Sequence, residues 1–251
     1  MSTVLATYNV KGGVGKTSAA VNLAYLAALD GANTLLWDLD PQGASTYLFR
    51  VRPKIKGGAA KLVRGKRHIS GLIKGTDFER LDLLPADFSY RHMDLALDSA
   101  KRPTRRLSRV LAPVADEYDY IFLDCPPSIS LVSESVFEAA DALLVPLIPT
   151  TLSSRTFHQL RKVVAASTRA PRVLAFFSMV DGRKRLHREV MESLSTEQGV
   201  LSAAIPTSSD VERMGLHRSV VDRSAPRRSG ARAYRALWRE ICDQLATQPH
   251  P

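Results

Sequence analysis

The stretch Val10-Lys11-Gly12-Gly13-Val14-Gly15-Lys16-Thr17 decides the fold of this chain. It follows a β-branched and aromatic run, Thr3 to Tyr8, which predicts a strand, and it opens an Ala-rich run, Thr17 to Leu29, which predicts a helix. The order strand, glycine loop, helix is typical of the phosphate loop G-x-x-x-x-G-K-[ST]. Here Gly15-Lys16-Thr17 is in place, but Val10 occupies the position of the leading glycine and a lysine follows it.

The residue types of this loop indicate its chemistry. Gly12, Gly13 and Gly15 carry no side chain and accept positive φ, so successive backbone N–H groups can approach a polyphosphate closely. The helix that begins near Thr17 directs its positive end at the same anion. Lys16 is expected to neutralise the β and γ phosphates, and the Thr17 hydroxyl is expected to hold Mg²⁺. The alternative is a glycine-rich turn with an exposed lysine, and the flanking strand and helix favour the phosphate loop.

Composition narrows the class of protein. A chain of 251 residues that is 45% hydrophobic fits one large α/β domain. Its apolar stretches are too short for a membrane span and no leader precedes the first strand, which predicts a cytoplasmic protein. The two cysteines, Cys125 and Cys242, cannot form a disulfide framework and lack metal-ligand spacing. The net charge of +10 predicts attraction to a polyanion, nucleic acid being the commonest, with a merely solubilising surface as the alternative.

Two further motifs place carboxylates at the ends of predicted strands. The run 33–39 leads into Asp38-Leu39-Asp40-Pro41-Gln42-Gly43, and the run 118–124 leads into Asp124-Cys125-Pro126-Pro127-Ser128. Ligands of parallel sheets lie at the carboxyl ends of the strands. We therefore expect Asp124 to bind Mg²⁺, directly or through water, beside Thr17. Asp38 and Asp40 are expected to act on Mg²⁺-bound or attacking water, with capping of the next helix as the alternative.

The remaining predicted strands are short apolar runs that alternate with helical segments. They span residues 81–84, 142–146, 173–180 and 200–205, with a helical pattern at 153–168. This alternation predicts an α/β fold, namely a doubly wound, mostly parallel sheet with helices on both faces. No linker, repeat or domain boundary interrupts it, so we expect a single domain over residues 1–251.

Positive charge is concentrated in particular segments. Residues 50–76 contain nine Lys or Arg and no Asp or Glu, which predicts an irregular basic excursion from the sheet; a phosphate contact and a solvated loop are both open interpretations. The region 90–112 carries helical signals, and its arginines are expected on a solvated helix face. From residue 151 onward, 17 Lys or Arg stand against 9 Asp or Glu.

The last periodic run, residues 231–245, has apolar side chains along one helix face. A basic amphipathic helix of this kind binds anionic membranes in some proteins. We favour a helix docked on the sheet, because its apolar face is needed to cover that sheet.

Together, the loop at residues 11–17 and the two acidic motifs resemble the ParA/MinD family of deviant Walker A ATPases. The element Asp40-Pro41-Gln42-Gly43 favours the ParA partition branch, and the pieces Ile205-Pro206 and 231–234 resemble the same group, so the resemblance covers nearly the whole chain. It implies a P-loop NTPase fold, ATP and Mg²⁺ as cofactors, and slow, partner-stimulated hydrolysis of ATP to ADP and phosphate.

The resemblance also implies a role for individual residues. Lys11 would be the lysine that reaches across a dimer to the partner's ATP, while Lys16 binds phosphate in its own subunit. Thr17 and Asp124 would hold Mg²⁺, Asp38 would support the shell of that ion, and Asp40 would orient or activate the hydrolytic water. The expected catalytic residues are Lys11, Lys16 and Asp40, and the expected nucleotide-binding residues are Lys11, Gly12, Gly13, Val14, Gly15, Lys16, Thr17, Ser18 and Pro206.

The function implied by the resemblance is that of a positioning ATPase. It would dimerise on ATP, bind double-stranded DNA without sequence preference, and segregate a chromosome or plasmid or distribute another large cargo over the nucleoid. A ParB-like or cargo-adaptor partner would stimulate hydrolysis. The candidate DNA-binding residues, which dimerisation would bring together, are Arg183, Lys184, Arg185, Arg188, Arg213 and Arg218. Ser178 departs from the family, because relatives often carry Asn near the adenine.

Three other functions are weighed against this one. A MinD-like, membrane-associated spatial regulator is suggested by the last helix. An electron-transfer ATPase like the nitrogenase iron protein needs paired cysteines for its cluster, and Cys125 alone does not supply them. A non-catalytic nucleotide-binding scaffold is disfavoured by Asp40.

Overall fold

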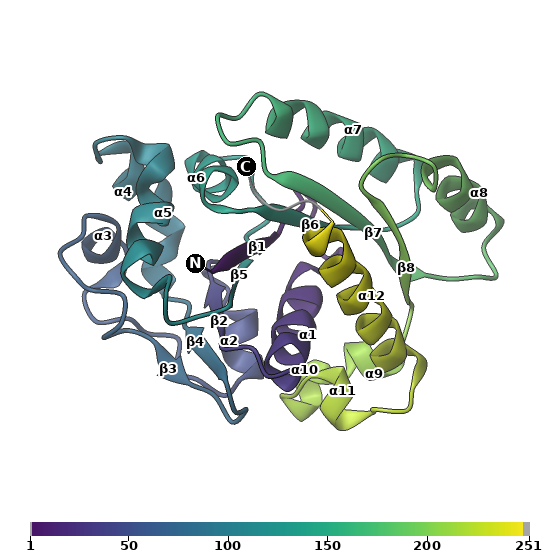
Figure 1. The fold of residues 1–251 in the computed structure, drawn as a ribbon, viewed down its shortest axis with the longest axis horizontal. Coiled ribbons are helices and arrows are strands. Elements are labelled where there is room, and N and C mark those ends of the chain that lie inside the picture. The colour runs from purple at the N-terminus through teal and green to yellow at the C-terminus, as the bar shows by residue number, and fades with distance from the viewer. Residues whose placement is uncertain (1, 248–251) are drawn as a thin grey trace.

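The computed structural model describes residues 2–247, and their strands form one eight-stranded sheet in the order β3-β4-β2-β5-β1-β6-β7-β8 (Figure 1). Neighbouring strands are parallel except β3 and β4, which are antiparallel. The predicted mostly parallel α/β sheet is therefore confirmed. The strand bounds are β1 Thr3–Thr7, β2 Thr34–Asp38, β3 Lys74–Gly75, β4 Leu81–Leu84, β5 Tyr120–Asp124, β6 Ala142–Leu147, β7 Arg172–Val180 and β8 Val200–Pro206.

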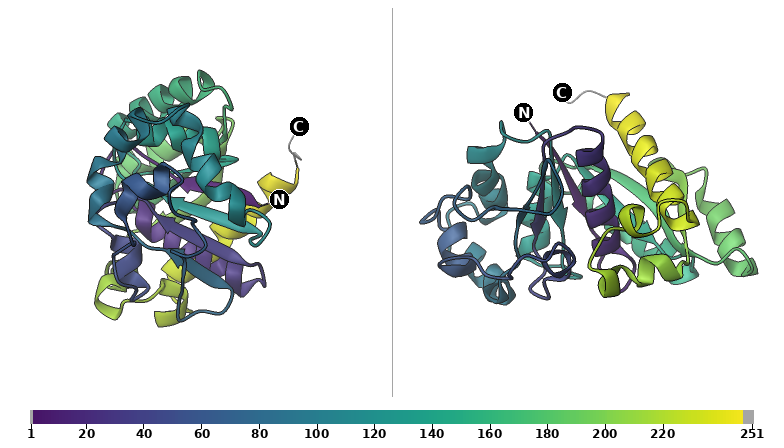
Figure 2. Two further views of the ribbon diagram at one scale, coloured as in Figure 1. Left: turned by 90° about the vertical axis from the view of Figure 1, so that its left-hand side faces the viewer. Right: turned by 90° about the horizontal axis from the view of Figure 1, so that it is seen from below.

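Alternation along the strands divides the core into two layers. In β1, Val4 and Ala6 belong to one buried cluster and Leu5 belongs to the other. In β5, Leu123 belongs to the first cluster and Phe122 to the second. Successive side chains of a strand point to opposite faces, so a strand that is apolar at every position must be covered on both sides. Helices cover both faces of this sheet, as the sequence predicted (Figures 1 and 2).

The helices are distributed over the two faces as follows. One face carries α1 Lys16–Leu29, α2 Ala44–Leu48, α9 Ser209–Glu212, α10 Met214–His217, α11 Val221–Ser224 and α12 Ser229–Ala246. The other carries α3 Gly58–Val63, α4 Met93–Asp98, α5 Arg106–Leu111, α6 Leu131–Ala139, α7 Thr151–Ala165 and α8 Arg185–Leu194. Short 3-10 turns, η1 Phe88–His92, η2 Pro103–Arg105 and η3 Ala112–Val114, join the pieces around α4 and α5.

The structure corrects the expectation of an irregular excursion at residues 50–76. Within this segment lies α3, which buries Ala59, Leu62 and Val63 in the core layer that it shares with α4 and α5, and the short β3 follows it. Lysines and arginines surround this helix and glycines flank it. Its apolar periodicity spans less than two turns and is easily overlooked. The helical signals of 90–112 are likewise divided between α4 and α5.

The last helix, α12, lies beside α1, as Figure 2 shows. Its apolar side chains, among them Tyr234, Leu237 and Ile241, are buried in the core layer that also contains α1 and β8. The expectation of a docked helix is confirmed, and the face that a membrane would require is occupied. Among residues 2–247, no helix is long and apolar enough to cross a membrane.

Trp238 offers a direct test of this docking. It is 4% exposed, its ring contacts Tyr120 edge to face, and its Nε1 donates a hydrogen bond to Asp30 Oδ2 over 2.8 Å. We expect Trp238→Ala to lower the free energy of unfolding by about 3–5 kcal/mol, the usual cost of removing a large buried aromatic side chain. Urea unfolding followed by circular dichroism measures this. The control Arg239→Ala removes the exposed neighbour and should change stability by less than about 0.5 kcal/mol; equal losses in the two variants would contradict the packing.

Candidate functional site

Two buried carboxylates lie side by side at the carboxyl edge of the sheet. Asp124 ends β5 in register with Thr7 of β1 on one side and with Asp38 of β2 on the other, and all three side chains are fully buried. The Ser45 hydroxyl donates to Asp124 Oδ2 over 2.7 Å. Thr46 donates to Asp38 Oδ2 through both its backbone N–H (2.8 Å) and its hydroxyl (2.7 Å). The first turn of α2 therefore fixes both acids.

Burial raises the pKa of both carboxyls. The charge of Asp124 raises the pKa of Asp38 further, while hydrogen bonds from Ser45 and Thr17 oppose the rise at Asp124. The hydrogen bond from Thr17 also places the first turn of α1 next to Asp124. Two like charges held in a low-dielectric site are costly, and a cation among them removes that cost.

The loop before α1 has the backbone conformation that its glycines permit. Gly13 (φ +71°) and Gly15 (φ +96°) lie in the left-handed region, which favours glycine. Gly15 is the N-cap of α1 and no side chain caps the helix, so the first-turn N–H groups stay available to an anion. A Cβ at Gly12 or Gly13 would meet no atom within 4 Å, so the loop has open space beside it.

The two lysines of the loop are in different environments. Lys16 is 7% exposed, burial lowers the pKa of its ammonium, and its Nζ donates to the Lys11 carbonyl over 2.9 Å. The half-buried Lys11 is held at its backbone N–H by Asn9 Oδ1 (2.9 Å), and Asn9 Nδ2 donates to the Pro146 carbonyl. Within residues 2–247, the Lys11 ammonium itself makes no hydrogen bond or ion pair.

Asp40 lies in the turn between β2 and α2. Its backbone N–H donates to Asp38 Oδ1 over 3.3 Å, and its Oδ1 accepts from the Gln42 N–H over 2.9 Å. Gly43, at φ +66°, then caps α2. The half-buried Asp40 is therefore presented at the same edge of the sheet as Asp38 and Asp124.

Several residues of this site were missed by reading the sequence. Ser45 and Thr46 stand two and three residues after Gly43, and hydroxyls at the start of a helix that follows an acidic motif were the available signal. Asn9 gave no signal of its own. Of the other predicted nucleotide residues, Val14 is buried and Ser18 half-buried next to the loop, while Pro206 ends β8 in register with Val180.

The residues fit a site in which Mg²⁺ is bound mainly by phosphate oxygens and water, with few ligands from the protein. Within residues 2–247, no three His, Cys, Asp or Glu side chains form a metal-binding group of their own. Mg²⁺ in phosphate sites keeps several waters and uses one or two carboxylates together with phosphate oxygens, so a cage of protein ligands is not required. The buried acid pair, the Thr17 hydroxyl beside it and the open glycine loop supply what such a site needs.

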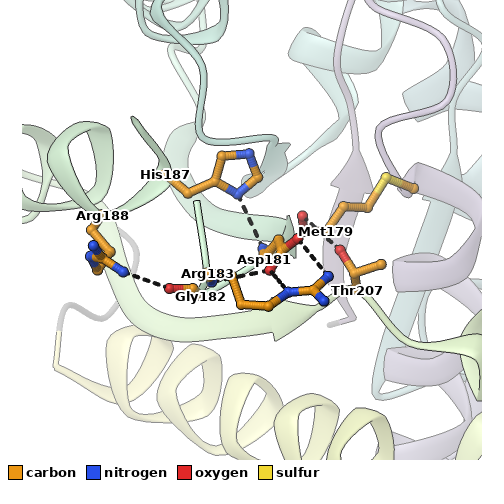
Figure 3. Close-up of polar contacts among 7 residues, drawn as sticks. All are labelled: Met179, Asp181, Gly182, Arg183, His187, Arg188 and Thr207. Atoms are coloured by element: carbon orange, nitrogen blue, oxygen red, sulfur yellow. Dashed lines mark hydrogen bonds and ion pairs between the residues drawn. The ribbon is translucent and has the colours of Figure 1, made fainter. Parts of the chain in front are cut away.

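The first group of predicted DNA contacts lies in the β7–α8 loop and the first turn of α8, where Arg183 and Arg188 are bonded to residues of the loop (Figure 3). Arg183 Nε and a terminal nitrogen each contact the Asp181 carboxylate at 3.0 Å, which lowers the pKa of Asp181 to about 2. Arg188 donates to the Gly182 carbonyl over 2.8 Å. The buried His187 accepts the Asp181 N–H at Nδ1 over 3.1 Å. In α8, Arg185 forms an i,i+4 ion pair with Glu189.

The second group lies elsewhere on the molecule. Arg213 and Arg218 flank α10, which packs on the face covered by α1, whereas α8 covers the other face. Arg218 Nε donates to the Tyr47 carbonyl of α2 over 3.0 Å, and its guanidinium lies over the Tyr47 ring at 4.5 Å. One protomer therefore does not gather the six predicted contacts into one patch.

Comparison with known proteins gives the family. The AAA domain family matches residues 2–172. The chain is 30% identical to the chromosome-partitioning ATPase Soj of Treponema pallidum over 96% of this chain and 97% of that protein. It is also 30% identical to the chromosome partitioning protein ParA of Caulobacter vibrioides, over 95% and 93%. Among solved structures, cobyrinic acid a,c-diamide synthase of Mycobacterium smegmatis with bound ADP and magnesium is similar, with a TM-score of 0.82 and 26% identity over 98% of this chain and 96% of that one.

These findings, together with the loop and its acid pair, show that the chain belongs to the ParA/MinD family of deviant Walker A P-loop ATPases. Two of the relatives that match over nearly the whole chain are named as chromosome-partitioning proteins.

Gly12 and Gly13 form a matched pair that tests the loop geometry. Both have open space around them, but only Gly13 has a positive φ. We expect Gly13→Ala to destabilise the nucleotide-free protein by about 1 kcal/mol, because alanine is strained in the left-handed region. Gly12→Ala should leave stability unchanged or raise it slightly, because alanine restricts the unfolded chain. Urea unfolding of both variants measures this difference. Equal stability of the two variants would show that Gly13 does not have a positive φ.

Proposed function

We propose that this chain is a Mg²⁺-dependent ATPase that dimerises on ATP, binds double-stranded DNA without sequence preference, and segregates a chromosome or plasmid or positions another large cargo on the nucleoid. The proposal rests mainly on one observation: at the carboxyl edge of the sheet, the loop of residues 10–17 lies beside Asp38, Asp40 and Asp124. This edge combines a helix start without a side-chain cap, a buried lysine whose ammonium bonds to the loop backbone, and a buried acid pair. The names of the sequence relatives, which are chromosome-partitioning proteins, support DNA as the proposed cargo.

The residues of the edge have distinct proposed tasks. The N–H groups of residues 12–17 bind the phosphates of ATP, and Lys16 exchanges its bond to the Lys11 carbonyl for a phosphate oxygen. Thr17 and Asp124 hold Mg²⁺, with Asp38 behind them, and the ion supplies charge neutralisation at the β and γ phosphates. Asp40, fixed by the Gln42 N–H, orients the attacking water.

Lys11 explains the proposed dependence of dimerisation on ATP. Its ammonium has no partner within the described chain, while its backbone is fixed at both the N–H and the carbonyl. If two protomers face each other with ATP between them, the two nucleotides repel each other, and a lysine donated from each side offsets that repulsion. Loss of the γ phosphate on hydrolysis removes this attraction and releases the dimer.

Dimerisation would also create the DNA-binding surface. The predicted contacts lie in separate places on one protomer, in the β7–α8 loop and around α10. Two copies double the number of phosphate contacts and make binding steeply dependent on salt. The dimer would then stay on DNA as long as ATP is bound. A ParB-like or cargo-adaptor partner that stimulates hydrolysis would determine how long this bound state lasts.

The test compares the parent protein with Lys11→Ala. With ATP and Mg²⁺, the parent should become a dimer in sedimentation velocity, and its affinity for a duplex of arbitrary sequence should rise and remain salt-sensitive. Lys11→Ala should still bind ATP but show neither the dimer nor the rise, because the lysine donated across the interface is missing. Anisotropy of a labelled duplex measures the affinity.

The matched control is Lys162→Ala, which removes an exposed lysine of α7 and should behave as the parent. The proposal fails if ATP does not change the DNA affinity of the parent. The role of Lys11 fails if the variant dimerises as well as the parent does.

A further inference from the structure

A second concentration of positive charge lies on the α3 and α5 end of the sheet and takes no part in the site described above. Residues 56–67 contain five Lys or Arg, residues 101–109 contain five more, and neither segment contains an acid. We name the Lys and Arg side chains of these two segments the α3–α5 basic surface. It lies at the opposite end of the sheet from α8 (Figures 1 and 2).

Packing joins the two segments into one surface. Arg106 Nε donates to the Val63 carbonyl at the end of α3, and an Arg64 terminal nitrogen donates to the Ser99 hydroxyl over 3.3 Å. Between α3 and α5 is a recess of about 170 Å³, bordered by Arg67, Arg106 and Arg109. The floor of the recess is apolar, with Leu62, Ile69 and Val110 among its lining residues, while the three arginines and His68 supply its polar groups. Guanidinium groups bind phosphate oxygens in pairs, so a phosphate can be held among these arginines.

The charges of this surface are not neutralised by the chain itself. Within residues 2–247, no Lys or Arg of the two segments forms an ion pair. The first group of predicted DNA contacts differs, because Arg183 of the β7–α8 loop and Arg185 of α8 are each paired with an acid. The intervening α4 carries two acids, Asp94, which accepts the Val132 N–H, and the exposed Asp98, and neither forms an ion pair with a cation of this surface within the described residues.

We propose that the α3–α5 basic surface binds the phosphate backbone of double-stranded DNA, and that it does so in the single protomer without ATP. Exposed cations without acid partners and a phosphate-sized recess favour a phosphate backbone, because such contacts are electrostatic and independent of sequence. Neither segment exposes a large apolar side chain, although Leu95 of the neighbouring α4 is exposed, so an acidic polypeptide is the competing occupant that the experiment tests. The choice of DNA as the polyanion rests on the proposed function.

This surface has a different role from that of the ATP-dependent contacts. All of its cations belong to one chain, so its affinity does not depend on bringing two copies together. A protomer that has hydrolysed ATP therefore keeps a weak, salt-sensitive hold on DNA and can rebind nearby. For residues 56–67, the proposal favours the phosphate contact over the solvated loop, the two interpretations that the sequence left open for the basic segment 50–76.

The experiment measures DNA binding without nucleotide, by anisotropy of a labelled duplex over a range of salt concentrations. Lys16→Ala, which is expected not to bind ATP, should still bind the duplex at low salt as the nucleotide-free parent does. Adding Lys61→Ala, Arg64→Ala, Lys66→Ala and Arg67→Ala should remove this binding. In the parent background, the same four substitutions should make the salt slope shallower by about 1 for each phosphate that the protein no longer neutralises.

The matched control replaces four exposed cations outside both surfaces, Arg155, Lys162, Arg232 and Arg239, by alanine and should retain the binding. Unfolding midpoints verify that the variants are folded. The single variant Lys66→Glu, whose parent side chain makes no hydrogen bond or ion pair within the described chain, repeats the test with one exposed substitution.

Three results would overturn the inference: no duplex binding by the nucleotide-free parent, an unchanged salt slope in the fourfold variant, or tighter binding of polyglutamate than of DNA at this surface. None of them concerns the rise in affinity with ATP, so the proposed function can fail or hold independently.

Discussion

The arrangement on which the rest of the structure depends is the juxtaposition of two buried carboxylates, Asp38 and Asp124, at adjacent strand ends. Within residues 2–247, neither acid forms an ion pair; Asp124 is held by the Ser45 hydroxyl, and Asp38 by the hydroxyl and the N–H of Thr46. A protein that only needed a stable core would place apolar side chains there, because buried like charges cost several kcal/mol unless something compensates them. The geometry is that of a site whose compensating charge arrives with a ligand.

Helix α2 connects this site to a distant part of the chain. Ser45 and Thr46 hold the acid pair, and the next residue, Tyr47, receives Arg218 at its carbonyl and at the face of its ring. Three consecutive residues of α2 therefore contact both the acid pair and the segment around α10.

The sequence predicted those parts of the fold that have a strong local signal. Strand positions, the loop of residues 10–17 and the apolar face of α12 follow from periodicity and glycine spacing, and the two acidic motifs stood at strand ends as expected. Ser45 and Thr46 were not found, because their importance depends on which strands are neighbours. The short α3 was missed because its few buried residues stand among lysines. The pairing of Arg183 with Asp181 was also invisible, since a charge run does not show which members are neutralised.

The most direct test of the site concerns the need of the acid pair for a cation. The unfolding temperature of the protein should be measured with ATP and Mg²⁺, with ATP and EDTA, and without ligand, for the parent and for Asp124→Asn. We expect ATP with Mg²⁺ to stabilise the parent, by about 2.7 kcal/mol at a hundredfold excess over the dissociation constant. EDTA should remove most of this gain, and Asp124→Asn should lose the dependence on Mg²⁺. Equal stabilisation of the parent by ATP in Mg²⁺ and in EDTA would contradict the need for a cation.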